Sequence, residues 1–247
     1  MKSNNKITSQ SRGLVWLTGA SSGIGYALAR EFGSNNFAVI VSGRRATSLR
    51  RLRDRITSEG GEAHVIVCDV RRELSVNSAA RKIVRSFGVP DILVNNAGVT
   101  VFKKFVDTSV REFDSIVNTN LRGSFLTTKA LLAKMIRRRS GIILNIVSFA
   151  AKTTYTESSA YAASKAGVTA MMEGLRAEVR GKGIKIVNVF PGAVLTPIWR
   201  PNVRMKYGDQ MLAPEEVAKM IFAASRQPLK LMVEEIVIRP QRGDINA

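Results

Sequence analysis

Short apolar runs alternate with amphipathic stretches along most of the 247 residues. The runs are unbroken, which is typical of parallel strands that are buried on both faces. We predict strands over residues 14–17, 37–41, 63–67, 92–94, 142–147, 184–189 and 233–238. Between them the pattern predicts helices through 26–32, 52–56 and 83–84, over 110–138 and 159–180, and from 214 onward.

This alternation predicts a single domain over residues 1–247 with an α/β fold of the Rossmann type. The expected architecture is a doubly wound parallel sheet of about seven strands with helices on both faces. Residues 193–213 lack a regular pattern and carry Pro197 and Pro201, so we expect an irregular segment there.

Basic residues exceed acidic ones by enough to give a formal net charge of +19. They are spread along the chain, and no finger, recognition-helix or aromatic RNA-binding pattern accompanies them. A nucleic-acid partner is therefore not expected, although such a surface suits an acidic partner or an anionic substrate. No apolar run is long enough to span a bilayer, and residues 1–6 are polar, so we expect a cytoplasmic protein without membrane association.

The only cysteine, Cys68, cannot form an internal disulfide and lies in an apolar run, which favours a buried structural thiol. The only histidine, His64, lies within a predicted strand and is expected to pack there. Because no further histidine or cysteine is present, we expect no metal site.

A glycine-rich segment, Thr-Gly-Ala-Ser-Ser-Gly-Ile-Gly, joins the first strand to the first helix. Glycine permits a positive φ and close approach, and a helix N-terminus offers free N–H groups to an anion. An ordinary glycine-rich turn is the alternative, but the strand-to-helix context favours a dinucleotide site. The residues expected to bind its phosphates are Gly19, Ser21, Ser22, Gly23, Ile24 and Gly25.

The end of the second strand favours NADP(H) over NAD(H). An acid at this position binds the ribose 2′-hydroxyl of NAD, whereas a basic residue accepts a 2′-phosphate. Here no acid follows the strand, and Arg44 is placed to pair with the phosphate. Asp69 and Val70, after the third strand, are placed to contact the adenine end, with a helix-capping role as the alternative for Asp69.

Tyr161 and Lys165 are four residues apart on a predicted helix and share one face. An ammonium beside a phenol favours the phenolate, so we expect the pKa of Tyr161 to be lowered. The phenol would then serve as a proton donor and acceptor near neutral pH.

These motifs, in this order and spacing, resemble the short-chain dehydrogenase/reductase family over nearly the whole chain. The resemblance implies proton delivery by Tyr161, carbonyl polarisation by Ser148, and a water held by Asn120 that links Lys165 to solvent. Lys165 would also hold the nicotinamide ribose. Further cofactor-binding positions implied by the resemblance are Asn96, Ala97, Gly98, Pro191, Gly192, Val194 and Thr196.

The resemblance implies an enzyme that reduces a ketone or aldehyde, with 193–213 as a lid over an apolar or aromatic substrate. The C-terminal residues 234–245 and the stretch 191–199 resemble sepiapterin-reductase-like and broad carbonyl reductases more than 3-oxoacyl-carrier-protein reductases. A 3-oxoacyl-carrier-protein reductase, with acyl carrier protein as partner, is the alternative. A non-catalytic module that senses cofactor or binds nucleic acid stays open, but the four intact catalytic positions argue against it.

We also expect a homo-oligomer, a tetramer by resemblance or else a dimer. The helical patterns over 110–138 and 159–180 carry apolar residues on more than the one stripe that a sheet requires. A second exposed stripe would form an association surface.

Overall fold

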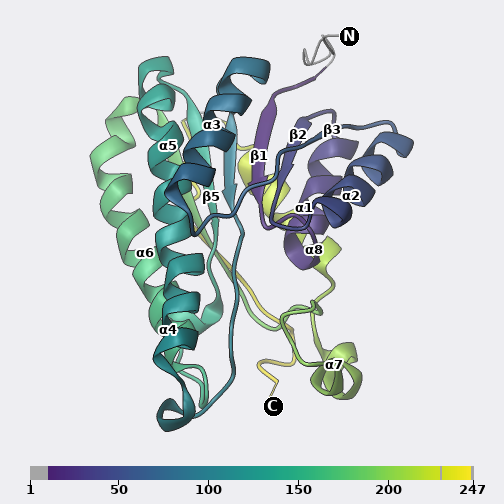
Figure 1. Ribbon diagram of the computed structural model, residues 1–247, viewed down its shortest axis with the longest axis vertical. Coiled ribbons are helices and arrows are strands. Elements are labelled where there is room, and N and C mark those ends of the chain that lie inside the picture. Colours follow the sequence, from purple (N-terminus) through teal and green to yellow (C-terminus); the bar gives the residue numbers. More distant parts are fainter. Residues whose placement is uncertain (1–10, 229, 246–247) are drawn as a thin grey trace.

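A parallel sheet of seven strands, in the order β3-β2-β1-β4-β5-β6-β7, forms the centre of the computed structural model (Figure 1). The structure describes residues 11–228 and 230–245, so most of the polar N-terminal segment lies outside the described residues. The strands are β1 (Leu14–Thr18), β2 (Ala38–Ser42), β3 (Glu62–Val65), β4 (Ile92–Asn95), β5 (Gly141–Ile146), β6 (Ile184–Pro191) and β7 (Glu235–Ile238).

Helices cover both faces of the sheet, as predicted (Figure 1). The face with α1, α2 and α8 packs on one apolar cluster, and the face with α3, α5 and α6 packs on a second. The helices are α1 (Gly23–Ser34), α2 (Ala46–Ser58), α3 (Glu73–Phe87), α4 (Val110–Val117), α5 (Gly123–Arg138), α6 (Ser159–Val179), α7 (Pro201–Tyr207) and α8 (Pro214–Ser225).

Successive residues of β1 supply the two clusters in turn, because side chains alternate across a strand. Val15 and Leu17 face the α1 side, whereas Leu14 and Trp16 face the α3 side. All four side chains are buried, so the hydrophobic effect holds both helical layers to the central strand.

The strand order reverses at β1, which pairs with β2 on one side and β4 on the other. In an open parallel sheet, the crevice outside the carboxyl ends of such strands is the usual ligand site. The turns after β1 and β4 both carry predicted site residues, so the topology places them together.

Two expected elements differ from the structure. The helix expected over 110–138 is divided into α4 and α5 by a π-helical turn over Asn118–Arg122. The segment 193–213, expected to be irregular, contains α7, with Pro201 at its first position, and a 3₁₀ turn over Gly208–Gln210. A proline in the first turn does not break a helix, because its missing N–H would have no partner there.

Candidate active site

The turn between β1 and α1 exposes the N-terminus of α1. Gly19 and Gly23 have φ values of +67° and +59°, a region that favours glycine. Ser22, which precedes α1, makes no side-chain capping bond, and the first turn holds no acid. The free N–H groups and the positive end of the helix dipole therefore suit an anion such as a pyrophosphate.

The side chain of Asn96, after β4, holds this turn in place. Its amide donates hydrogen bonds of 3.0 Å to the carbonyl oxygens of Thr18 and Gly19. A Cβ at Gly25 would collide with this amide and lie 2.6 Å from the Gly19 carbonyl oxygen, and one at Gly19 would lie 2.7 Å from Cα of Ala97. The two turns at the switch point are thus in direct contact, and glycine is required at both positions.

Basic side chains gather near the end of β2, where the sequence predicts a 2′-phosphate site. Arg44 is exposed, and no acid lies at the end of the strand. The guanidinium of Arg45 donates a 3.1 Å hydrogen bond to the Ser21 hydroxyl on the glycine turn. The sequence pattern does not predict this contact, because it depends on how the β2–α2 loop folds back over the turn.

Asp69 and Val70 lie beyond the end of β3. Arg71 binds the Asp69 carboxylate through Nε and Nη2, at 2.9 and 2.7 Å, and these bonds hold the pKa of Asp69 below its usual value. Val70 is buried in the second core cluster and contacts Gly123. Asp69 therefore has a cationic partner within the protein, and Val70 packs against α5.

Ser148, Tyr161 and Lys165 come together where β5 ends and α6 begins. Ser148 follows β5 and lies close enough to Tyr161, in the first turn of α6, for its hydroxyl to oppose the rise in the pKa of the phenol. One turn further, Lys165 is buried, and its Nζ donates a 2.7 Å bond to the carbonyl oxygen of Ile146. The Lys165 Nζ lies 5.8 Å from the centre of the Tyr161 ring. The three predicted side chains thus form one cluster.

The pKa values of this pair correct one expectation. Burial raises the pKa of Tyr161, and the Ser148 hydroxyl only partly opposes this effect. Burial likewise lowers the pKa of Lys165 to about 8. The expected lowering of the Tyr161 pKa by Lys165 is therefore wrong for this structure, because the cost of desolvating a phenolate outweighs the attraction of the ammonium.

Asn120 lies in the π-helical turn and is buried. Its Oδ1 accepts a 2.9 Å bond from the Val99 N–H, and its Nδ2 donates 3.0 Å bonds to the Val99 carbonyl oxygen and the Ser164 hydroxyl. A Cβ at Gly98 would lie 3.5 Å from Asn120 Oδ1 and 3.6 Å from Lys165 Nζ. Asn120 therefore ties the β4 turn to α6 directly beside the cluster of Ser148, Tyr161 and Lys165, the candidate catalytic cluster.

The loop after β6 reaches back to the glycine turn. The Gly192 N–H donates a 2.7 Å bond to the Ile238 carbonyl oxygen, which fixes the chain as it leaves Pro191. Val194 forms a bridge with Leu212 across the segment. Thr196 is buried, and a Cβ at Gly23 would lie 3.0 Å from its methyl group. Thr196 thus lies beside the first turn of α1, close to the predicted phosphate site.

The segment 193–213 also contacts the loop after β4. The rings of Trp199 and Phe102 stack with centroids 5.1 Å apart and planes 9° from parallel. The Arg200 guanidinium donates a 3.0 Å bond to the Phe102 carbonyl oxygen, and the Trp199 indole donates a 3.1 Å bond to the Val194 carbonyl oxygen. Leu195 and Ile198 remain partly exposed. The segment therefore packs on the loop after β4 and offers an apolar and aromatic surface there, and its role as a lid stays a prediction.

Other titratable residues are engaged elsewhere. His64 Nε2 lies 2.9 Å from Glu62 Oε1 and its ring lies against Phe87, while burial raises the pKa of the Cys68 thiol to about 11. Within residues 11–228 and 230–245, no three His, Cys, Asp or Glu side chains are grouped to hold a metal ion. In the same residues, no helix has the length and hydropathy needed to cross a bilayer.

Comparison with known proteins agrees with this geometry. Residues 14–206 match the family model described as short chain dehydrogenase. Sepiapterin reductase of Chlorobaculum tepidum is 37% identical over 239 residues, which cover 94% of this chain and 98% of that protein. A metagenomic short-chain oxidoreductase solved with NADP is 30% identical with a TM-score of 0.83, over 95% of this chain and 99% of that one. An actinorhodin polyketide ketoreductase solved with NADPH is 29% identical with a TM-score of 0.87, over 94% and 98%. The chain therefore belongs to the short-chain dehydrogenase/reductase family of oxidoreductases.

Proposed function

We propose that this protein is an NADP(H)-dependent carbonyl reductase that interconverts a ketone or aldehyde and its alcohol. The observation that carries the proposal is the gathering of Ser148, Tyr161 and Lys165 beside the switch-point crevice, with the Lys165 Nζ 5.8 Å from the centre of the Tyr161 ring. A neutral phenol beside a hydroxyl is suited to deliver a proton to a carbonyl oxygen. No metal cluster is needed for this chemistry.

The residues present fit the cofactor. The uncapped N-terminus of α1 offers N–H donors to a pyrophosphate, the tight turn that Gly19 and Gly25 permit holds this end of the helix in place, and Arg44 and Arg45 suit a 2′-phosphate. The bound cofactor would supply a hydride for the carbonyl carbon. The residues that would hold it are Gly19, Ser21, Ser22, Gly23, Ile24, Gly25, Arg44, Asp69, Val70, Asn96, Ala97, Gly98, Tyr161, Lys165, Pro191, Gly192, Val194 and Thr196, with Arg45 added by the structure.

The protein's own part of the reaction is proton delivery and charge stabilisation. Reduction of a carbonyl places negative charge on its oxygen, and Ser148 and Tyr161 would donate hydrogen bonds to this charge. The O–H bond of Tyr161 then breaks, and its proton goes to the substrate oxygen. The nearby Lys165 ammonium stabilises the phenolate that remains, and proton return from solvent passes along the Asn120 side of the site.

The experiment is a panel of carbonyl compounds, followed by the loss of NADPH absorbance and repeated with NADH. It includes a pterin, because of the relative named sepiapterin reductase, together with a diketone, simple aromatic aldehydes and an acyl thioester. Turnover of ketones or aldehydes with NADPH supports the proposal. Turnover restricted to the acyl thioester favours the carrier-protein reductase, and no turnover of any compound contradicts an enzymatic role in carbonyl reduction.

A further inference from the structure

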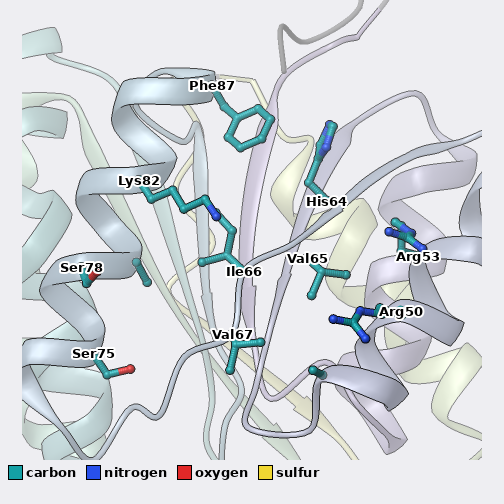
Figure 2. A pocket seen from close by; sticks show the side chains of 12 residues that line it. Arg50, Arg53, His64, Val65, Ile66, Val67, Ser75, Ser78, Lys82 and Phe87 are labelled. Carbon is teal, nitrogen blue, oxygen red and sulfur yellow. The ribbon is translucent and has the colours of Figure 1, made fainter. Parts of the chain in front are cut away.

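A groove lies along β3, which is one edge of the sheet. Its volume is about 660 Å³, its floor is the β3 edge from His64 to Val67, and α2 and α3 form its walls (Figure 2). None of Ser148, Tyr161 and Lys165 lines it. We call this feature the β3 groove, and it is separate from the catalytic cluster.

The floor of the β3 groove presents backbone hydrogen-bonding groups. Ile66 and Cys68 donate their N–H groups to the carbonyl oxygens of Val41 and Gly43 on the β2 side, at 3.2 and 3.0 Å. In an extended strand the groups of successive residues point to opposite sides. Val65 precedes Ile66, and Val67 lies between Ile66 and Cys68. Both valines therefore direct their N–H and C=O groups into the groove, where these groups have no backbone partner among the described residues.

Both walls of the groove are basic. Arg50 and Arg53 come from α2, and Lys82 comes from α3. Figure 2 shows Arg50 and Lys82 extending toward the strand from opposite walls. Arg53 is paired with Asp54 at 2.6 Å, whereas Arg50 and Lys82 have no ion pair within the described part of the chain. The groove therefore favours an occupant with negative charge on both sides.

We infer that the β3 groove binds an extended acidic peptide segment of a partner protein, which adds to the sheet as a further strand beside β3. A strand brings N–H groups to the exposed carbonyl oxygens and carbonyl oxygens to the exposed N–H groups. A small anion such as phosphate matches the N–H groups alone and is repelled by the carbonyl oxygens beside them. The combination of exposed donors and acceptors thus favours a peptide over a bare anion.

The alternation of side chains agrees with this occupant. Val65 packs on the α2 side of the sheet and Ile66 on the α3 side. The side chains of an added strand alternate in the same way. Its acids of one parity would meet Arg50 and Arg53, and those of the other parity would meet Lys82. The inference does not depend on the proposed reductase activity.

The test measures binding of the peptide fluorescein-Thr-Glu-Glu-Val-Glu-Val-Val-Thr-NH₂, whose glutamates occupy positions of both parities, by anisotropy. Saturating NADP⁺ is present throughout to cover the anion-binding groups of the catalytic site. A peptide of equal charge with its three valines replaced by proline serves as control, because proline cannot donate to the strand. Protein variants are Arg50→Glu/Lys82→Glu in the groove, the single change Val67→Pro, and Arg137→Glu/Arg138→Glu on α5 as the charge-matched control.

We expect the valine peptide to bind at least tenfold more tightly than the proline peptide. The groove double variant should weaken binding by roughly tenfold, since two attractions become repulsions, and the α5 control should change it far less. Hydrogen exchange should slow at the Val65 and Val67 amides when the valine peptide is added. The inference would be overturned if both peptides bind equally or if neither binds. It would also be overturned if inorganic pyrophosphate displaces the valine peptide and hydrogen exchange at the Val65 and Val67 amides stays unchanged. If Val67→Pro does not fold, the double variant and the exchange data decide.

Discussion

The side-chain amide of Asn96 donates a 3.0 Å hydrogen bond to the carbonyl oxygen of Gly19, joining the turn after β4 to the turn after β1. These turns lie on neighbouring strands at the point where the strand order reverses. The position of the glycine turn, where we propose that the cofactor phosphates bind, is therefore fixed in part by a residue 77 positions further along the chain.

Replacing Asn96 tests this relationship. Asn96→Ala removes two hydrogen bonds to partly buried carbonyl oxygens and should lower the free energy of unfolding by about 1–3 kcal/mol. It should also weaken NADPH binding, because the glycine turn is no longer held. Urea denaturation and isothermal titration measure the two effects. The control Asn77→Ala, on the α3 helix, should change stability by about 0.5 kcal/mol or less. Unchanged NADPH affinity in Asn96→Ala would show that the turn is held by other contacts.

Arg44 should determine the preference for NADPH. A hydrogen bond to a charged group contributes about 1.5–3 kcal/mol, so Arg44→Ala should raise the NADPH dissociation constant by roughly 10- to 150-fold. NADH binding should change little. Arg45→Ala is the matched variant, and because Arg45 already bonds Ser21, it should show a smaller loss for NADPH. An equal loss for both cofactors in Arg44→Ala would mean that the arginine acts through the structure of the loop.

Tyr161→Phe should remove the proton donor while it leaves the apolar ring in place. We expect turnover to fall at least ~100-fold, the lower range for general acid catalysis, with NADPH affinity largely kept. Steady-state kinetics with the best substrate of the carbonyl panel measures the first quantity, and cofactor titration measures the second. Tyr26→Phe on α1 is the control and should keep most of the turnover. Near-normal turnover of Tyr161→Phe would reject the assignment.

Lys165 should make stability depend on pH in a defined window. Its pKa is about 8 in the folded protein and 10.5 in its ordinary range, so the unfolded chain binds more protons between these values. Stability should therefore rise with pH, by on the order of 1–2 kcal/mol between pH 7.5 and 9.5. The raised pKa of Tyr161 acts in the opposite direction, but only above about pH 10. Denaturation of the wild type and of Lys165→Met across this window measures the effect, and an equal slope in both would assign it to other groups.

The protein should assemble as a homo-oligomer, with a tetramer as the first expectation. Of the apolar residues on the long helices, Ile116, Leu131 and Met135 are core residues, whereas Phe113 and Phe125 are 44% and 45% exposed. Exposed aromatic side chains on α4 and α5 favour association between copies. Light scattering at micromolar concentration should give a mass above the 27.0 kDa of one chain, and Phe113→Glu/Phe125→Glu should reduce it. A stable, fully active 27.0 kDa species would contradict the prediction.

Periodicity predicts the central strands well, because β1, β2 and β4 are buried apolar runs. The edge strands β3 and β7 contain polar residues and are only partly buried, so their predicted bounds are each off by two residues at one end. Periodicity did not reveal the π-helical turn around Asn120, because one extra residue rotates the apolar stripe of α5 relative to that of α4, and over 110–138 this rotation looks like apolar residues on more than one stripe. The first turn of α7 is hidden for a different reason. A short helix that starts at Pro201 and buries no residue leaves no apolar stripe to detect.

The sequence predicts that Ser148, Tyr161 and Lys165 belong to one site. It does not predict the electrostatic environment of these side chains. Spacing places Tyr161 and Lys165 on one helical face, and the structure brings Ser148 to them. The direction of the Tyr161 pKa depends on how much protein surrounds the phenol, which is a property of the tertiary fold. The same holds for Asn96, whose type suggests a polar role but whose partners belong to a strand far away in sequence.

Gly98 has a consequence for how this protein can vary. It is exposed at the end of the β4 turn, and a Cβ there would be in van der Waals contact with both Asn120 Oδ1 and Lys165 Nζ, at 3.5 and 3.6 Å. A larger residue at this position would therefore contact Asn120 and Lys165, although neither of these two residues is itself replaced. Variation at this exposed position is thus restricted by the side chains beneath it, so the active clones of a library randomised at this codon should be enriched in glycine and alanine over larger residues.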